Sequence, residues 1–391
     1  MSVEEVDLAA SAAAERDRPP PIRVIRVLGS LDTGGAEQRA IELIPRLVAA
    51  GVIPHFVTLS GRKGSMAPVA EQFGAHVHPL PIDARFPLRF LRLIRQLRPR
   101  AVHSEVATFS GVPLLLAALA GRPVRIAHFH NDGDGHPDTL RRRWQRAVMR
   151  KLISTFATDI IGVAPGTLTH LYRRSWESDA RCRVLANGHD LDRLRQPSAV
   201  NLRATVAATP GELLCLCVCR PAPVKRRPMV PAIIAALGAR GIAARAVLVG
   251  PRDRVDDREV LAAARAHGVA DRVHLLGPRD DVGGLLRQAD LLLHPAEREG
   301  LPGTVLEALA LGTPVVAADL PGIRFIRDHL PGLTTLDVTA PAQDWAEAVQ
   351  TLGLRPGQGH DVEEAVRRFE ASVFSLTTAA EQHLAMYTRS G

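Results

Sequence analysis

Two glutamates, Glu299 and Glu307, stand on either side of a turn that is rich in glycine and proline. A short apolar run at 291–293 precedes the turn, and helical spacing of apolar residues resumes after it. A helix that begins at Gly303 leaves the amides of Gly303 and Thr304 free to bind a phosphate group. Carboxylates accept hydrogen bonds, and the hydroxyls of a sugar donate them. The pattern therefore favours a nucleotide sugar, although a charge at a helix start and a solvated residue on a helix face would also explain the two glutamates.

Two cations, Arg220 and Lys225, directly follow a second apolar run at 213–219. The run predicts a buried strand, so both cations would lie at its carboxyl end. Two fixed cations there would neutralise a diphosphate and stabilise the charge that builds on it as it leaves. The neighbouring Arg226 and Arg227 leave open the alternative of an ordinary basic loop.

The first half of the chain opens with a strand–loop–helix pattern. Residues 22–28 predict a strand, a loop with Gly34 and Gly35 follows, and helical periodicity begins at Ala36. This is the opening of a Rossmann-like domain. The loop lacks the G-x-G-x-x-G spacing of dinucleotide sites, which argues against a dehydrogenase.

A pair of histidines marks the end of a later strand, predicted at 124–128. His128 falls within the strand, so we expect it in the core or behind the site. His130 begins the loop that follows, and ligands usually bind at such positions in parallel sheets. His130 is therefore the candidate for contact with a ligand.

Three carboxylates near this loop, Glu105, Asp132 and Asp134, have candidate roles beyond that of turn residues. They could line an acceptor pocket, where they would attract an acceptor that bears amines, such as an aminocyclitol. Alternatively, the two aspartates, with His136 nearby, offer ligands to a hard cation.

These residues must be positioned by two domains, because 391 residues are enough to bury two cores. We expect a disordered tail at 1–21, a first domain at 22–195, a linker at 196–211 and a second domain at 212–372. Short apolar strands that alternate with helical stretches predict mostly parallel sheets covered on both faces. The strands are predicted at 22–28, 55–59, 76–80, 101–103, 124–128 and 159–163, and then at 213–219, 246–249, 273–276, 291–293 and 314–317.

The stretch 299–316 resembles the E-x7-E signature of retaining glycosyltransferases of family 4, which have the GT-B fold. The likeness rests on Glu299-Gly300-Leu301-Pro302, on Glu307-Ala308, on Gly312-Thr313-Pro314-Val315-Val316 and, upstream, on the R-x4-K spacing of Arg220 and Lys225. It implies an α/β fold of two Rossmann-like domains whose parallel sheets face each other across a cleft. It also implies that a C-terminal helix at about 373–391 packs back on the first domain.

The resemblance implies roles for the candidate residues. Glu299 would bind hydroxyls of the donor sugar, Glu307 the ribose of the nucleotide, and His130 the donor sugar. The two cations would bind the diphosphate, and the loop of Gly34 and Gly35 would approach the donor phosphates. Because GT-B enzymes usually need no metal, we expect neither a metal ion nor another cofactor.

The implied reaction is retaining transfer of a hexosyl or N-acetylhexosaminyl unit from a nucleotide sugar, in the first place a UDP-sugar such as UDP-GlcNAc, to a hydroxyl. The acceptor would be a small molecule of secondary metabolism, as in antibiotic biosynthesis, or a polysaccharide or lipid intermediate. A GT-B sugar-nucleotide epimerase is the alternative enzyme. A basic protein that binds nucleic acid or membrane is the non-enzymatic alternative.

Composition narrows these alternatives. The net charge of +8 comes mainly from arginines spread along the chain, and only 4% of residues are aromatic, so we expect no nucleic-acid partner. Arg89, Arg92, Arg95 and Arg98 would form a basic stripe, either solvated or in weak contact with a membrane. Four cysteines without a paired framework, and no secretory signal, predict a cytoplasmic protein.

Overall fold

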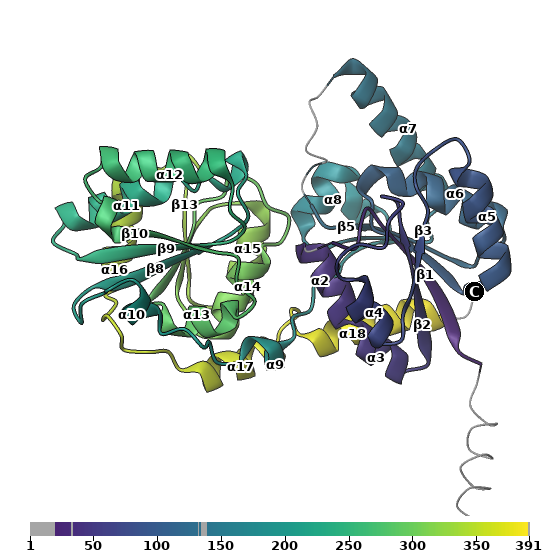
Figure 1. Ribbon diagram of the computed structural model, residues 1–391. Coiled ribbons are helices and arrows are strands. Elements are labelled where there is room, and N and C mark those ends of the chain that lie inside the picture. Colours follow the sequence, from purple (N-terminus) through teal and green to yellow (C-terminus); the bar gives the residue numbers. More distant parts are fainter. Residues whose placement is uncertain (1–19, 33, 132, 134–138, 390–391) are drawn as a thin grey trace, which may run out of the picture.

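The computed structural model describes residues 20–32, 34–131, 133 and 139–389. Two α/β domains lie side by side (Figure 1), and each is a parallel sheet with helices on both faces. The predicted fold class, GT-B, is confirmed. The predicted disordered tail, apart from its last two residues, lies outside the described residues.

The N-terminal domain contains a seven-stranded parallel sheet in the order β3-β2-β1-β4-β5-β6-β7. Its strands are β1 (Ile22–Leu28), β2 (Val52–Thr58), β3 (His76–Pro79), β4 (Ala101–Ser104), β5 (Val124–Phe129), β6 (Asp159–Gly162) and β7 (Cys182–Val184). Its helices include α2 (Gly35–Glu42), α3 (Ile44–Ala49), α4 (Ala67–Gln72), α5 (Phe86–Leu97), α6 (Gly111–Leu119), α7 (Leu140–Phe156) and α8 (Pro165–Leu171). Strand β7 was not predicted, since its three residues carry no clear apolar pattern.

The C-terminal domain contains a six-stranded parallel sheet in the order β10-β9-β8-β11-β12-β13. Its strands are β8 (Leu213–Val218), β9 (Ala244–Val249), β10 (Val273–Gly277), β11 (Leu291–His294), β12 (Val315–Ala318) and β13 (Leu333–Leu336). Its helices include α11 (Met229–Ala239), α12 (Arg254–Ala266), α13 (Val282–Gln288), α14 (Gly303–Ala310), α15 (Pro321–Arg327) and α16 (Ala342–Thr351). Strand β13 was also missed, because its sequence is half polar and half-buried.

The strand order determines where a ligand can bind. In each sheet the chain first adds strands on one side of a central strand, β1 or β8, and then continues on its other side. The direction of building therefore reverses between β1 and β4 and between β8 and β11. Loops diverge at the carboxyl ends of such neighbouring strands, and this divergence creates the usual binding position of open α/β sheets. The candidate residues follow these strands: Gly34 and Gly35 follow β1, Glu105 follows β4, Arg220 and Lys225 follow β8, and Glu299 follows β11.

Two crossings join the domains. The first runs through α9 (Leu191–Leu194) and α10 (Leu202–Thr205). The expected linker is partly ordered here, because Leu202 is buried and its amide donates a hydrogen bond to Gln288 of α13. The second crossing runs from α17 (Val362–Glu370) to α18 (Leu376–Thr388). Helix α18 packs on the N-terminal sheet, where Met386 and Tyr387 join one core cluster with Val24. None of the described helices is long and apolar enough to cross a bilayer.

Candidate active site

The cation Lys225 and the carboxylate Glu299 form an ion pair at the carboxyl ends of β8 and β11. The two loops are also joined through their backbones, because the Glu297 amide donates to the Val224 carbonyl at 2.9 Å. Burial alone would raise the pKa of the Glu299 carboxyl, but its contacts with His294 and Lys225 lower that pKa to about 2. Glu299 is therefore an ionised hydrogen-bond acceptor at neutral pH.

The loop that carries Arg220 and Lys225 is fixed from behind. Arg227 is only 1% exposed, and its guanidinium lies 2.7 Å from the carboxylate of Asp256 on α12. Arg227 is thus a buried residue that fixes this loop to α12. The alternative of an ordinary basic loop did not predict this burial. Arg220 itself is exposed at the end of β8.

Helix α14 begins at Gly303, four residues after Glu299 in the sequence. No acceptor in the described part of the chain takes a hydrogen bond from the amides of Gly303 and Thr304, and both residues are partly exposed. These amides lie at the positive end of the helix dipole and can donate hydrogen bonds to an anion. A diphosphate between this helix end and the two cations would have opposite charge on both sides.

Gly300 brings the N-terminal domain against this loop. A Cβ atom added to Gly300 would overlap the carbonyl oxygen of His130 and would lie 3.0 Å from the Cα of Asn131. Only glycine allows this approach of the two backbones. The candidate residues Glu299 and His130, from different domains, are therefore neighbours.

His130 is held by a buried carboxylate. Its Nε2 lies 2.9 Å from Oε2 of Glu105, and Oε1 of Glu105 lies 2.7 Å from both Nε and Nη2 of Arg26. The side chains of Arg26 and Glu105 are 2% and 0% exposed. Burial would raise the pKa of the Glu105 carboxyl, but Arg26, His103 and His130 together outweigh burial and hold that pKa well below its usual range. The ionised carboxylate accepts a hydrogen bond from Nε2 of His130, and Nδ1 of His130 is buried without a hydrogen-bond partner among the described residues.

This geometry corrects the expectation that Glu105 lines an acceptor pocket. Its carboxylate has no exposed surface and is already bonded to Arg26 and His130. The other two acceptor candidates, Asp132 and Asp134, lie outside the described residues.

A ladder of histidines continues behind His130 into the core. The rings of His128 and His130 are 4.0 Å apart, and Nδ1 of His128 lies 3.1 Å from Nε2 of His103. His103 in turn lies 2.7 Å from the hydroxyl of Tyr387 on α18. Burial lowers the pKa of His103 and of His128 well below the usual value, so both are neutral. The expectation that His128 sits behind the site agrees with its 1% exposure.

Two groups of described residues could offer three ligands to a metal ion, because their ligand atoms lie within 4.8 Å of one another. They are His103, His128 and His383, and Glu105, His128 and His130. The Arg26 guanidinium lies beside Glu105, and its charge also lowers the pKa values of His103 and His383. A buried cation would be repelled by this guanidinium. Most of the side-chain nitrogens and oxygens of these residues form hydrogen bonds, whereas Nε2 of His128, Nδ1 of His130 and Nε2 of His383 are buried without a hydrogen-bond partner among the described residues. A hydrogen-bonded network therefore explains the cluster better, and the absence of a metal stays a prediction.

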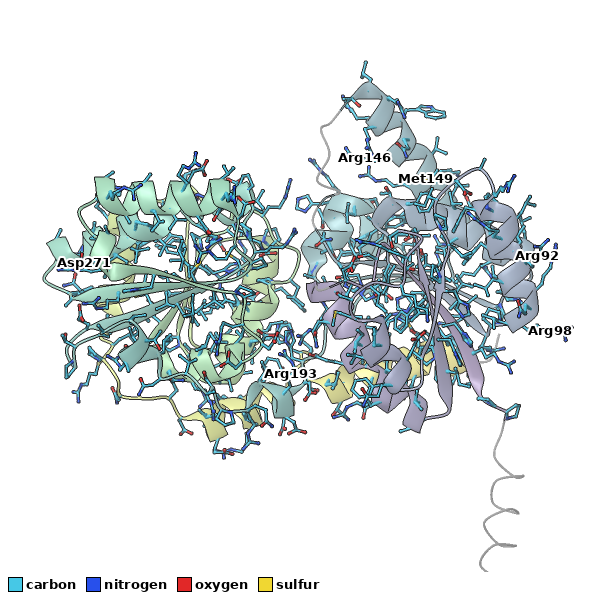
Figure 2. The ribbon with its side chains drawn as sticks, viewed as in Figure 1. Arg92, Arg98, Arg146, Met149, Arg193 and Asp271 are labelled. Atoms are coloured by element: carbon cyan, nitrogen blue, oxygen red, sulfur yellow. The ribbon has the colours of Figure 1, made fainter. Side chains whose placement is uncertain are left out.

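Glu307 forms a cluster of charges between the domains. Its Oε1 lies 3.3 Å from Arg39 of α2 and 3.2 Å from Arg193 of α9. Arg39 also donates to Nδ1 of His189 at 2.6 Å, and Glu42 pairs with both arginines. Figure 2 shows Arg193 at the junction of the two domains. His189, to which the sequence assigned no role, is a buried acceptor in this junction.

Glu37 is a further site residue that the sequence analysis passed over. A Cβ atom added to Gly34 would overlap its carboxylate, so the side chain of Glu37 folds over the loop of Gly34 and Gly35. Burial raises the pKa of the Glu37 carboxyl, while the charges of His130 and Arg220 act in the opposite direction. The glycine loop therefore contacts this carboxylate, and the charges of His130 and of Arg220 from the other domain act on it.

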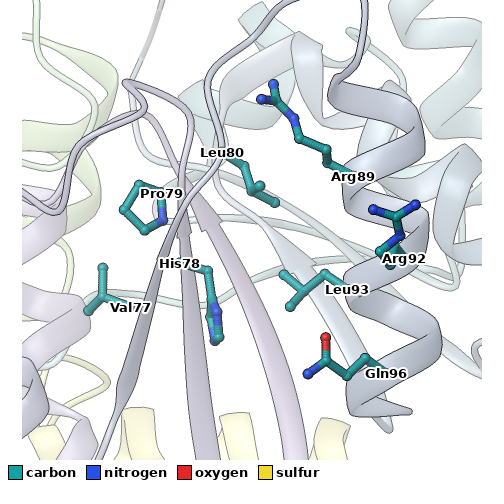
Figure 3. Close-up of a pocket in the computed structure, with 8 residues that line it drawn as sticks. All are labelled: Val77, His78, Pro79, Leu80, Arg89, Arg92, Leu93 and Gln96. Atoms are coloured by element: carbon teal, nitrogen blue, oxygen red, sulfur yellow. The ribbon is translucent and has the colours of Figure 1, made fainter.

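The expected arginine stripe lies elsewhere, on α5. Arg89 bonds to Asp83 and to the Pro81 carbonyl, and Arg98 is a left-handed C-cap beyond the helix. A pocket of about 300 Å³ lies between this helix and β3, with Arg89 and Arg92 on one side (Figure 3). It contains none of the candidate donor residues, and of the four arginines only Arg98 lies beyond the end of the helix.

Comparisons with known families cover both domains. The sequence profile described as Glycosyltransferase Family 4 matches residues 33–193, and the profile described as Glycosyl transferases group 1 matches residues 213–353. Together the matches cover both sheets except β1, and they include the loops that carry the candidate residues.

Individual proteins give the same result. A Bacillus subtilis (strain 168) protein that bears the name of a glycosyltransferase, EpsF, is 29% identical over 84% of this chain and 86% of its own length. The D-inositol 3-phosphate glycosyltransferase of Actinosynnema mirum is 34% identical over 49% of this chain and 47% of its own length.

Solved structures match the whole fold. Anabaena Alr3699/HepE in complex with UDP has a TM-score of 0.75 at 19% identity, covering 93% of this chain and 98% of that one. The same protein in complex with UDP-glucose has a TM-score of 0.72 at 20% identity, covering 92% and 98%.

Proposed function

We propose that this chain, a family 4-like glycosyltransferase with the GT-B fold, transfers a hexosyl or N-acetylhexosaminyl unit from a UDP-sugar to a hydroxyl acceptor with retention of configuration. The observation that carries the proposal is the ion pair of Lys225 and Glu299, beside unpaired amides of α14 and with His130 of the other domain pressed against Gly300. A diphosphate and a sugar need such a set of groups.

Donor binding would rearrange the ion pair. The diphosphate would take Lys225 as a partner, together with Arg220 and the amides of Gly303 and Thr304. Glu299, ionised because its pKa is about 2, would then accept hydrogen bonds from sugar hydroxyls. His130, whose Nε2 is held by Glu105, would contact the donor sugar from the N-terminal domain. Glu307 would accept from the ribose at Oε2, because Arg39 and Arg193 both contact Oε1.

Catalysis would then depend on positioning and on charge. The cations stabilise the negative charge that develops on the departing diphosphate, and the charges are fixed before the reaction begins. In the same-face substitution proposed for such retaining enzymes, the departing phosphate helps to deprotonate the acceptor hydroxyl. The bond from the anomeric carbon to the phosphate oxygen breaks, the bond to the acceptor oxygen forms, and the acceptor proton ends on the phosphate.

The structurally similar Anabaena protein is bound to UDP in one structure and to UDP-glucose in another, which supports a uridine nucleotide as the first candidate. A thermal-shift panel of UDP-, GDP- and ADP-sugars, each at the same concentration, tests this choice. We expect the largest increase in the melting temperature with a UDP-sugar. No increase with any nucleotide sugar would contradict the proposal, and turnover of the donor to another nucleotide sugar without acceptor would favour an epimerase.

Of the three carboxylates expected to bind an aminocyclitol acceptor, Glu105 is excluded, because it is buried in its ion pair with Arg26. The hypothesis now depends on Asp132 and Asp134. Rates with amine-bearing and neutral acceptors, measured for wild type and for Asp132→Asn and Asp134→Asn, test it. The hypothesis requires both variants to lose preference for the amine-bearing acceptor.

A further inference from the structure

Helix α7 projects from the N-terminal domain. Figure 1 shows its amino-terminal half standing clear of the other elements, and of its 17 residues only Ile153 is buried. The carboxyl half is anchored, because Gly111 lies close against the backbone of Met149 and the side chain of Leu152. Figure 2 shows Met149 close to where the helix meets the domain. The amino-terminal half therefore has a different environment from the rest of the helix.

The projecting half carries exposed apolar side chains. Leu140 is 81% exposed and Trp144 is 71% exposed. At 3.6 residues per turn, these two residues and Ala147 fall on one face, and Met149 and Ile153, which lie on the domain side, fall on the opposite one. The apolar stripe thus points away from the core that the same helix helps to build.

Cations flank this stripe. Residues 139–158 contain no acidic residue and six cations, which are Arg141, Arg142, Arg143, Arg146, Arg150 and Lys151. Arg141 and Arg143 are exposed and fall on either side of Leu140 and Trp144. Three aspartates in the preceding segment 132–138 offset part of this charge, so the stretch stays positive. Arg150 donates hydrogen bonds to the carbonyls of His170 and Leu171, so it is held against the domain.

We propose that the projecting half of α7 is a docking surface for an anionic bilayer. Leu140 and Trp144 would enter the boundary between headgroups and acyl chains, and Arg141 and Arg143 would lie at the level of the lipid phosphates. Tryptophan is enriched at this boundary because its ring is apolar and its N–H is polar. Helices with one apolar face and a basic flank lie in the plane of the membrane–water interface. They bind more strongly as the buried apolar area and the attraction to anionic lipids increase. Charge complementarity selects an anionic membrane over a neutral apolar partner.

The surface also has a consequence for the acceptor, which rests on the proposed function. Strand β5 ends at Phe129, His130 follows, and α7 begins at Leu140. Docking through α7 would therefore bring the carboxyl edge of the N-terminal sheet toward the bilayer. An acceptor hydroxyl carried on a lipid anchor would be presented at the site from that side.

Co-sedimentation with vesicles of phosphatidylcholine, with and without phosphatidylglycerol, tests the docking surface on the full chain. We expect binding only to the anionic vesicles, with a decrease as salt is raised. The double variant Leu140→Gln, Trp144→Gln should bind at least about tenfold more weakly. Arg141→Gln and Arg143→Gln should each weaken binding roughly fivefold.

The matched control is Val255→Gln on α12, since Val255 is 66% exposed but lies in the other domain. It should bind vesicles like the wild type. Equal binding to neutral vesicles, or no effect of the double variant, would overturn the proposal. A dimer that Trp144→Gln dissociates, without vesicle binding by the wild type, would show that the stripe covers a second copy instead. UDP affinity should be unchanged in all these variants, so failure here leaves the proposed transfer reaction intact.

Discussion

At the scale of single residues, the candidate donor site holds opposite charges that neutralise each other. Lys225 and Glu299 form an ion pair, with side chains that are 13% and 18% exposed. Each is thereby kept in place and ionised, ready for a diphosphate on one side and sugar hydroxyls on the other. Contacts with His294 and with Lys225 together keep the pKa of Glu299 low despite its burial.

Lys225→Ala should lower kcat/KM by about 10- to 150-fold. A charge-assisted hydrogen bond contributes about 1.5–3 kcal/mol, and Lys225 would make it to the leaving group. Steady-state release of UDP measures the effect, and a cooperative urea unfolding transition shows that the variant is still folded. Lys63→Ala is the matched control, because Lys63 forms an exposed ion pair with Glu71. Full activity of Lys225→Ala would refute the role in binding the diphosphate.

Glu105 and Arg26 are a buried ion pair that also holds His130. Glu105→Gln should lower the free energy of unfolding by about 3 kcal/mol, because it leaves the Arg26 charge buried without its counter-charge. It should also lower kcat more than UDP affinity, since His130 would lose the carboxylate that holds its ring in place. Urea unfolding and steady-state kinetics measure the two effects.

Glu71→Gln is the control for this change, because it breaks an ion pair whose side chains are 55% and 38% exposed. Surface pairs contribute about 0–1 kcal/mol. If both substitutions destabilise the protein equally, the buried pair does not hold the site together.

At the scale of elements, the sequence predicted most of what positions the site. Buried parallel strands appear as continuous apolar runs, so β8 and β11 were visible, and their carboxyl ends had to meet because the strands are neighbours. Contacts between distant segments were not visible. Glu105 lies 79 residues from Arg26, and Arg39 lies 268 residues from Glu307. No local pattern marks such pairs, because the first depends on the pairing of β1 with β4 and the second on how the two domains pack.

Gly300→Ala tests the contact between the donor loop and the N-terminal domain. The added methyl group would overlap the His130 carbonyl and push the two loops apart. We expect kcat/KM to fall at least about tenfold, since a displacement of about 1 Å at a site can cost about a hundredfold. The melting temperature should fall by only a few degrees, because each domain keeps its own core.

Gly211→Ala serves as the control for this substitution. A Cβ atom at Gly211 meets nothing within 4 Å. It should leave kcat/KM unchanged. Wild-type activity in Gly300→Ala would mean that the two loops separate during the reaction without cost.

At the scale of the whole molecule, helix α18 ties the C-terminal end of the chain to the core behind the active site. His383 and Tyr387 of this helix lie against His103, which leads through His128 to His130. The sequence suggested the position of the helix only through the family resemblance. The histidine ladder could not be predicted, because its members come from β4, β5 and α18.

The buried histidines predict how stability depends on pH. Burial, with the charge of Arg26, lowers the pKa of His383 to about 4, so the unfolded chain binds a proton between pH 6.5 and 4 that the folded chain does not. The free energy of unfolding should therefore fall as the pH drops below 6.5, by roughly 1.4 kcal/mol per pH unit for each such histidine. Urea unfolding between pH 7.5 and about pH 5 measures this slope before the carboxylates titrate.

His383→Gln separates this contribution from the others. Its slope over the same range should be smaller by roughly 1 kcal/mol per pH unit. His170→Gln is the control, since His170 is exposed on α8. A slope that is the same in all three proteins would show that His383 is not held neutral in the folded state.

The most direct test of the proposed site is a structure of the protein with UDP bound. The diphosphate should lie between the side chains of Arg220 and Lys225 on one side and the amides of Gly303 and Thr304 on the other. The ribose should contact Glu307. A diphosphate bound elsewhere, with the ion pair of Lys225 and Glu299 left intact, would contradict the proposed site.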